Sequence, residues 1–442
     1  MKRSFSFFVS IVLCTGLISC GGYSNRNTQN RSGLTFRAFI SNPVNPSPTG
    51  GGFPGLDIID ANKDMLSPFE VSLSGAVASA GMMVESPKRD RTVVYSAGTA
   101  SSNSTLGIVD NATESATSSV ALPGPTESMF VASDSNTLFA AVPSAPITGQ
   151  SPGAVVQVSL PNSAVTATIP VPGARFVIPS PSGNQILVIS DTADVTGTVT
   201  VLAPAFISTG NALTPVVTNS PTTFFDKPVW AVFSSDGSTA YVMNCGPECG
   251  GTGTTASIAI VDMTQTPPIV TSDVPVTGGA TTGLLSGGNL YVSGTPPNAG
   301  ADCQANLCGV LTVFPGANLS AAPTTFAITD GYHSNLVMAP NNQLFIASRN
   351  CTNIIASGQT LGRGCLSVLN TGGGTVYTAA QSGDVTGIQP ILNRTVVYVC
   401  EGGAFSIYDT ALDLGSDRQL IPQTKTEITI VGQAIDVKLV DF

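Results

Sequence analysis

The chain has 442 residues, of which 42% are hydrophobic and 10% charged, and its formal net charge at pH 7 is −10. A chain this apolar is not intrinsically disordered. An acidic chain with few lysines and arginines also lacks the basic surface that nucleic acids require. We therefore expect a folded protein with no nucleic-acid partner.

The first 19 residues are typical of a bacterial export signal. Lys2 and Arg3 precede an apolar stretch over 5–17, which is too short to remain as a membrane-spanning helix. The ending Leu-Ile-Ser-Cys20-Gly resembles the lipobox of bacterial lipoproteins, in which the cysteine is lipidated. This resemblance predicts a signal peptide over 1–19, a lipidated Cys20 followed by a flexible tether to residue 33, and attachment to a membrane of the bacterial cell envelope, facing the periplasm or the cell surface. The alternative is an ordinary signal peptide that happens to end in cysteine.

Strand alternation and turn signals cover almost everything after residue 34. An aromatic or large apolar anchor recurs in the second strand of each unit about every 44 to 56 residues. The anchors are Phe39, Tyr95, Phe139, Leu187, Tyr241, Tyr291, Phe345 and Tyr398. Four short strands at this period indicate a β-propeller. The sequence therefore predicts an all-β fold over 34–442, a single propeller with eight four-stranded blades; seven blades is the alternative if irregular units over 127–218 merge.

The first unit lacks an innermost strand. Residues 36–41, 56–60 and 69–73 are expected to form its second, third and fourth strands, whereas 433–441 form a strand with no unit after it. Pairing this last strand with the first unit closes the ring and removes an exposed sheet edge. We predict that the two ends of the chain complete one blade together.

Several segments resemble the YVTN-repeat family of bacterial surface propellers and the related lactonase-type propellers. The matching segments are Ser-Ser-Asp-Gly-Ser-Thr-Ala-Tyr-Val-Met-Asn over 234–244, Ile-Val-Asp over 260–262, Ile-Val-Asp-Asn-Ala-Thr over 108–113 and Val-Thr-Ala-Thr-Ile-Pro-Val over 165–171. These motifs encode turns and blade packing, so the resemblance concerns the fold more than the activity. One tryptophan and one histidine are too few for WD repeats.

Six cysteines form three local pairs, each between the second and third strands of its unit. The pairs are Cys245 with Cys249, Cys303 with Cys308, and Cys351 with Cys365. In an exported protein such pairs predict disulfides, here fixing loops. A zinc site is the alternative, although the pairs lie on different blades and no histidine accompanies them. Cys400 is left over and is expected to be a buried thiol.

The second-to-third loops are long and rich in glycine and proline, and they share one face with the entries to the innermost strands. Those entries gather much of the chain's small complement of charged and aromatic polar groups, which makes the channel mouth the predicted site. Its candidate catalytic residues are His333, Arg175 and Glu127, and its candidate binding residues are Asp226, Trp230, Tyr332, Asp384 and Asp436. Structural alternatives exist for six of these eight residues: Asp226 and Asp384 as turn caps, Arg175 with Glu127 as a buried pair, Trp230 as blade packing, and His333 as a hydrogen-bonded structural group.

Two functions are compatible with this site. The first is a lipid-anchored binding module whose loop face engages an envelope protein, a polysaccharide or a small molecule. The second is a lactonase-like hydrolase or isomerase, in which Arg175 polarises a carbonyl group and His333 or Glu127 activates water. No cofactor is predicted; a calcium ion held by Glu127, Asp384 and Asp436 is a variant of the second function. The sequence favours the binding module.

Overall fold

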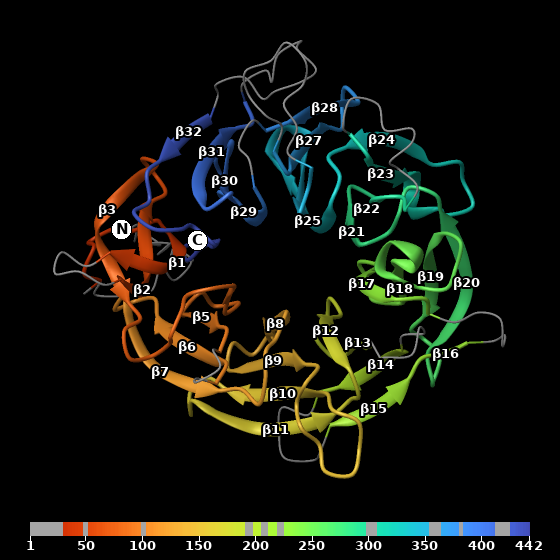
Figure 1. The fold of residues 1–442 in the computed structure, drawn as a ribbon, viewed down its shortest axis with the longest axis horizontal. Helices are drawn as coiled ribbons and strands as arrows, with labels where there is room; N and C mark the ends of the chain where they lie inside the picture. Colours follow the sequence, from red (N-terminus) through yellow and green to blue (C-terminus); the bar gives the residue numbers. More distant parts are fainter. Residues whose placement is uncertain are drawn as a thin grey trace, which may run out of the picture.

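The protein is an eight-bladed β-propeller (Figure 1). The computed structural model describes residues 30–46, 52–98, 103–190, 198–204, 211–218, 225–297, 307–352, 364–379, 383–411 and 425–442. Within these ranges the strands form eight sheets arranged around a central channel, seven with four strands and one with five. The prediction of eight blades is confirmed. Cys20 and the predicted signal and tether up to residue 29 lie outside the described residues.

Each blade has four antiparallel strands, of which the first named below is the innermost, and blade 5 has one additional parallel strand. The strands of blades 1 to 4 are β33 (Asp436–Leu439), β1 (Arg37–Pro46), β2 (Gly52–Asp60) and β3 (Met65–Ser72); β4 (Met83–Glu85), β5 (Arg91–Ser96), β6 (Thr105–Asp110) and β7 (Ser115–Ala121); β8 (Ser128–Val131), β9 (Thr137–Val142), β10 (Ala154–Ser159) and β11 (Ala164–Pro170); and β12 (Ala174–Pro179), β13 (Ile186–Ser190), β14 (Thr198–Ala203) and β15 (Ala212–Pro215).

Blades 5 to 8 continue the same order. Their strands are β17 (Pro228–Phe233), β18 (Thr239–Asn244), β19 (Ala256–Asp262) and β20 (Ile269–Val276), with β16 (Val217–Thr218) added outside β20; β21 (Thr282–Ser286), β22 (Asn289–Gly294), β23 (Gly309–Phe314) and β24 (Thr324–Ile328); β25 (Tyr332–Ala339), β26 (Gln343–Arg349), β27 (Leu366–Asn370) and β28 (Thr375–Thr378); and β29 (Val385–Pro390), β30 (Val396–Glu401), β31 (Ala404–Asp409) and β32 (Lys425–Ile428). Short 3-10 turns are η1 (Gly246–Cys249), η3 (Pro315–Ala317) and η4 (Pro340–Asn342).

The hydrophobic core is divided among the eight interfaces between neighbouring blades. Successive side chains of a strand point to opposite faces of its sheet. On β1, for example, Phe39 packs against blade 2, while Ala38 and Ile40 pack against blade 8. Both faces of the middle strands are therefore buried, which explains why these strands are almost continuously apolar in sequence.

The ring closes as predicted. β33 pairs antiparallel with β1, from Ala38 opposite Leu439 to Ser41 opposite Asp436. The expected end of β1 and start of β2 were wrong. β1 extends to Pro46 and β2 begins at Gly52, and the two pair as a hairpin with an irregularity between Asn42 and Asn45. The connection between them, expected over 42–55, is therefore much shorter. The parallel strand β16 was not predicted.

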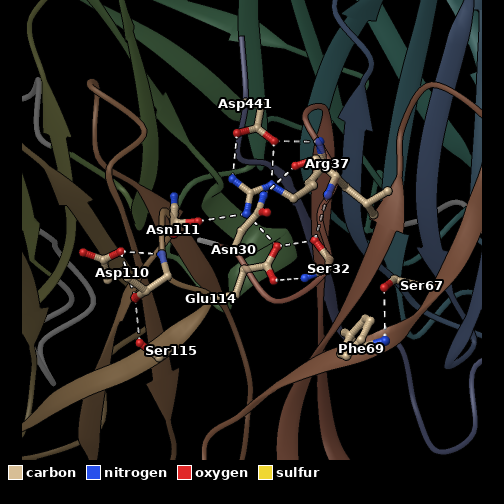
Figure 2. A network of polar contacts seen from close by, with 12 residues as sticks. Asn30, Ser32, Arg37, Ser67, Phe69, Asp110, Asn111, Glu114, Ser115 and Asp441 are labelled. Atoms are coloured by element: carbon tan, nitrogen blue, oxygen red, sulfur yellow. Dashed lines mark hydrogen bonds and ion pairs between the residues drawn. The ribbon is translucent and has the colours of Figure 1, made fainter. Parts of the chain in front are cut away.

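A buried ion-pair network reinforces the closure (Figure 2). The Arg37 guanidinium donates to Asp441 at 2.8 and 2.9 Å and to Glu114 on blade 2 at 2.7 Å. Arg37 is 4% exposed and Glu114 is fully buried. Burial lowers the pKa of Arg37, but the hydrogen bonds and charges of Asp441 and Glu114 outweigh this effect and raise it. The network joins the first strand, the last strand and the next blade.

The two ends of the propeller carry different connections between strands. We call the end with the second-to-third connections and the entries to the innermost strands the loop face, and the opposite end, with the tight first-to-second turns, the hairpin face. The disulfides Cys245–Cys249 and Cys351–Cys365 lie on the loop face, as predicted. Cys303, a member of the third predicted pair, lies outside the described residues. Cys400 is a buried free thiol, and burial raises its pKa well above the ordinary value.

Candidate functional site

Three aspartates at the entries to innermost strands hold the loops of the loop face. Asp226 accepts hydrogen bonds from the backbone N–H groups of Thr252 (3.0 Å) and Gly253 (2.8 Å). Asp330 accepts from the N–H of Thr352 (2.8 Å), and Asp384 from that of Asn350 (2.7 Å). Such carboxylates cap loop backbone. This geometry supports the capping interpretation of Asp226 and Asp384.

Asp436 and Trp230 connect neighbouring blades. The Asp436 carboxylate accepts from the N–H of Met83 on blade 2 (2.8 Å) and from Lys438 Nζ (3.0 Å). Trp230 Nε1 donates to the carbonyl oxygen of Gly283 on blade 6 (3.1 Å), and its ring packs against the clusters on both sides of blade 5. These polar groups are therefore engaged in blade-to-blade contacts.

His333 does not converge with Arg175 and Glu127 as the hydrolase hypothesis requires. It is fully buried, and its Nε2 lies 2.9 Å from the Thr329 carbonyl oxygen. A carbonyl oxygen can only accept, so Nε2 carries the proton, and Nδ1 has no hydrogen-bond partner. Burial lowers the pKa of His333 to about 4. The imidazole ring packs against Gly309 of blade 6, so it lies in the interface between blades 6 and 7.

Arg175 and Glu127 do form a pair, but it is not buried. Arg175 Nε lies 2.9 Å from Glu127 Oε2, and the side chains are 32% and 58% exposed. Glu127 lies in the connection that enters blade 3, and Arg175 is the second residue of β12 in blade 4. The expectation of a buried pair was wrong because both residues lie at the open end of the channel.

The phenol of Tyr332 is influenced by charged side chains from several blades. The pKa of its phenol is raised, first by burial, and it is also raised by the charges of Glu127 and Glu248 and lowered by those of Arg175 and Arg349. Tyr332 lies on blade 7, opposite Arg349 in the pairing of β25 with β26. These charged groups come from blades 3, 4, 5 and 7, so side chains of four blades lie within electrostatic range of Tyr332. We call Glu127, Arg175, Glu248, Tyr332 and Arg349 the mouth cluster.

Glu248 is the member of this cluster that sequence reasoning missed. It lies in η1, inside the loop closed by the Cys245–Cys249 disulfide. Its Oε2 is buried and has no hydrogen-bond partner among the described residues. Gly279 lies so close that a Cβ added to it would be 2.8 Å from this oxygen. Burial raises the pKa of Glu248 to about 8, although the Thr295 N–H opposes the shift. Glu248 is therefore protonated at neutral pH.

Thr295 links Glu248 to Tyr332. Its N–H faces the Glu248 carboxylate, and its Oγ1 donates to the carbonyl oxygen of Gly331 at 2.8 Å. Gly331 directly precedes Tyr332 in the chain. The only sequence signal for Glu248 was its position inside the Cys-Gly-Pro-Glu-Cys motif, which predicts a fixed loop but no role for the carboxylate.

Metal-binding geometry was searched among the described residues. There, no group of three or more His, Cys, Asp or Glu side chains could hold a metal ion. Glu127, Asp384 and Asp436, the set considered for calcium, do not form such a group. In the same ranges, no helix is long and apolar enough to cross a membrane.

Solved structures with this architecture come from varied proteins. The chain is similar to dihydro-heme d1 dehydrogenase NirN, with a TM-score of 0.59 and 12% identity over 92% of this chain and 75% of that one. It is also similar to the periplasmic gluconolactonase of Pseudomonas aeruginosa, with a TM-score of 0.45 and 14% identity over 91% and 98% of the two chains. A third is the Cps50 β-propeller domain of Myceliophteria thermophila, with a TM-score of 0.48 and 13% identity over 75% and 96%.

At these identities the similarity concerns the fold alone. No family model matches the chain, and no curated protein matches it. The chain is an eight-bladed β-propeller. The YVTN repeat and lipoprotein status remain predictions from sequence.

Proposed function

We propose that the protein is a lipid-anchored propeller of the bacterial envelope that binds a small anionic ligand at the mouth cluster. The charge balance of this cluster carries the proposal. Arg175 and Arg349 supply two positive charges and Glu127 supplies one carboxylate, whereas burial raises the pKa of the second carboxyl group, Glu248, to about 8. The cluster is therefore net positive at pH 7, in a chain whose total charge is −10.

Arg349 is the group best suited to meet an anion. It is exposed at the end of β26, and within the described ranges it forms no ion pair or hydrogen bond through its side chain. Guanidinium groups bind carboxylates and phosphates through paired, charge-assisted hydrogen bonds. The neighbouring loops are fixed by two disulfides and by Asp226, Asp330 and Asp384, which lowers the entropy lost when a ligand binds.

Binding is favoured over hydrolysis because of His333. A general base must come within hydrogen-bonding reach of the proton that it removes. The His333 imidazole is instead buried in the interface between blades 6 and 7, and burial lowers its pKa. The hydrolase alternative would need another base, and Glu127 is already paired with Arg175. The mouth cluster thus supplies charge recognition without an evident nucleophile or base.

Ligand binding can be tested with the Cys20→Ala chain and matched sugars. We expect glucuronate and galacturonate, but not glucose or galactose, to raise the melting temperature and to change the fluorescence of Trp230, the single tryptophan. Arg349→Ala should weaken binding about 10- to 100-fold, since a hydrogen bond to a charged group contributes about 1.5–3 kcal/mol. Lys63→Ala, which removes an exposed charge from the hairpin face, is the control and should bind normally. Equal binding by Arg349→Ala, or no response to either acid, would contradict the proposal.

The anchor is tested separately by fractionation. We expect the wild-type chain to sediment with membranes and the Cys20→Ala chain to be released, because lipid chains on Cys20 would hold the protein at the bilayer. Retention of the variant on membranes would show that another anchor holds it.

A further inference from the structure

The described part of the chain begins on the hairpin face. Ser32 donates its backbone N–H to Glu114 Oε2 at 2.7 Å, its hydroxyl also contacts Glu114, and Leu34 packs on the cluster between blades 1 and 2 (Figure 2). Arg37 follows at the same end of β1, bound to Asp441. Any segment that precedes residue 30 must therefore leave the propeller from the hairpin face of blades 1 and 2.

An exposed apolar patch lies on the same blade. On β3, Met65 is 59% exposed, and Leu66 and Phe69 are exposed as well. Met65 pairs with Asp60, which pairs with Arg37, so β3 begins at the end of the sheet where the N-terminal segment is held. We call Met65, Leu66 and Phe69, together with Leu392, the rim patch.

Leu392 extends the patch onto blade 8. It is exposed in the turn between β29 and β30, two residues before Arg394. Arg394 binds Asp64, the residue that precedes Met65, at 2.6 and 2.7 Å. The turn that carries Leu392 therefore touches the turn that leads into β3.

β3 exposes more large apolar side chains than the other outermost strands whose exposure is described. It exposes three, whereas β11 and β15 expose one each, Val165 and Leu213, and β7, β20 and β24 expose none. Contiguous exposed apolar side chains mark a contact surface. Lys63, which is 70% exposed and lies 3.6 Å from Asp60, is in the turn that leads into β3, and apolar groups next to basic ones are typical of surfaces that lie on a bilayer.

We propose that the rim patch is the surface with which the protein touches the lipid bilayer. This inference rests on the lipid anchor proposed above. Ten peptide steps separate Cys20 from Asn30, a reach of at most about 35 Å. The anchor thus holds the hairpin face of blade 1 close to the lipid headgroups. The loop face and its mouth cluster point away from the membrane, toward soluble ligands.

The orientation can be measured with a matched pair of labels on the full lipidated chain. Met65→Cys reports on the rim patch, and Val431→Cys is the control, because Val431 is also 59% exposed but lies in the segment that enters β33 from the loop face. Each variant is labelled with a polarity-sensitive fluorophore and added to phosphatidylcholine–phosphatidylglycerol vesicles that contain doxyl-lipid quenchers. Buried Cys400 is not expected to react, and labelled wild-type chain corrects for any background.

We expect the label at position 65 to be quenched at least threefold more than the label at position 431. Equal quenching at the two positions, or none at position 65 in chains that float with the vesicles, would overturn the rim-patch contact while leaving the anchor intact. Chains that do not float at all would overturn the anchor and with it this inference. A second measurement uses the triple variant Met65→Ser, Leu66→Ser and Phe69→Ser, with Leu392→Cys as the labelled position on the rim patch. In this variant, the label at position 392 should be quenched no more than the label at position 431.

Discussion

Replacing Arg37 with alanine is expected to lower the free energy of unfolding by about 3–5 kcal/mol. The substitution removes the shared cation of Glu114, which is fully buried, and Asp441, leaving two carboxylates without their partner. It also removes the guanidinium that joins the first and last strands of the ring to Glu114 of blade 2. Chemical denaturation of the Cys20→Ala chain, with and without the Arg37 substitution, measures the difference.

Arg175→Ala is the matched control for that experiment. It removes the same side chain from another inter-blade ion pair, but Arg175 and Glu127 are 32% and 58% exposed. Exposed pairs contribute about 0–1 kcal/mol, so this variant should unfold almost like the wild type. If Arg37→Ala were no more costly than Arg175→Ala, the ring closure would depend on the β1–β33 pairing without help from the charges.

The propeller could be predicted from sequence because its determinants are local and repeated. Each blade needs a continuously apolar second strand and a tight turn, and both recur at visible positions such as Tyr241 with Ser235-Asp-Gly237. The closing strand was predictable because the first unit lacks an innermost strand and the last strand of the chain has no unit of its own. Each supplies what the other lacks. The 42–55 connection was misjudged because a hairpin that extends beyond the blade core is not marked by buried apolar residues.

The candidate site was only partly predictable because its geometry depends on side-chain direction. Neighbouring residues of a strand point to opposite sides. Tyr332 therefore faces the channel mouth while adjacent His333 enters the seam between blades. Asp226 was placed correctly at the strand entry, but its carboxylate turns to loop N–H groups that no sequence pattern specifies. Glu248 joins the cluster from another blade's loop, a position set by tertiary folding.

Glu248→Gln is expected to stabilise the protein at alkaline pH. In the unfolded chain this carboxyl ionises near its ordinary value of 4.5, whereas burial raises its pKa in the folded protein to about 8. The folded state therefore binds more protons between these values, and the free energy of unfolding falls as the pH rises through this range. Since one pKa unit corresponds to about 1.4 kcal/mol, we expect the glutamine variant to be more stable by on the order of 5 kcal/mol above pH 8 and nearly equal to wild type below pH 4.5.

The measurement is the difference in unfolding free energy between variant and wild type across pH 4 to 9. Taking the difference cancels other buried acids, such as Glu85, whose pKa is raised to about 7 by burial. Glu127→Gln is the control: it makes the same change in the same cluster, but Glu127 is more than half exposed and its pair with Arg175 is a surface pair, so the substitution should change stability by at most about 1 kcal/mol. A flat difference for Glu248→Gln as well would mean that Glu248 ionises normally. The mouth cluster would then be neutral overall, and the preference for anionic ligands would lose its electrostatic basis.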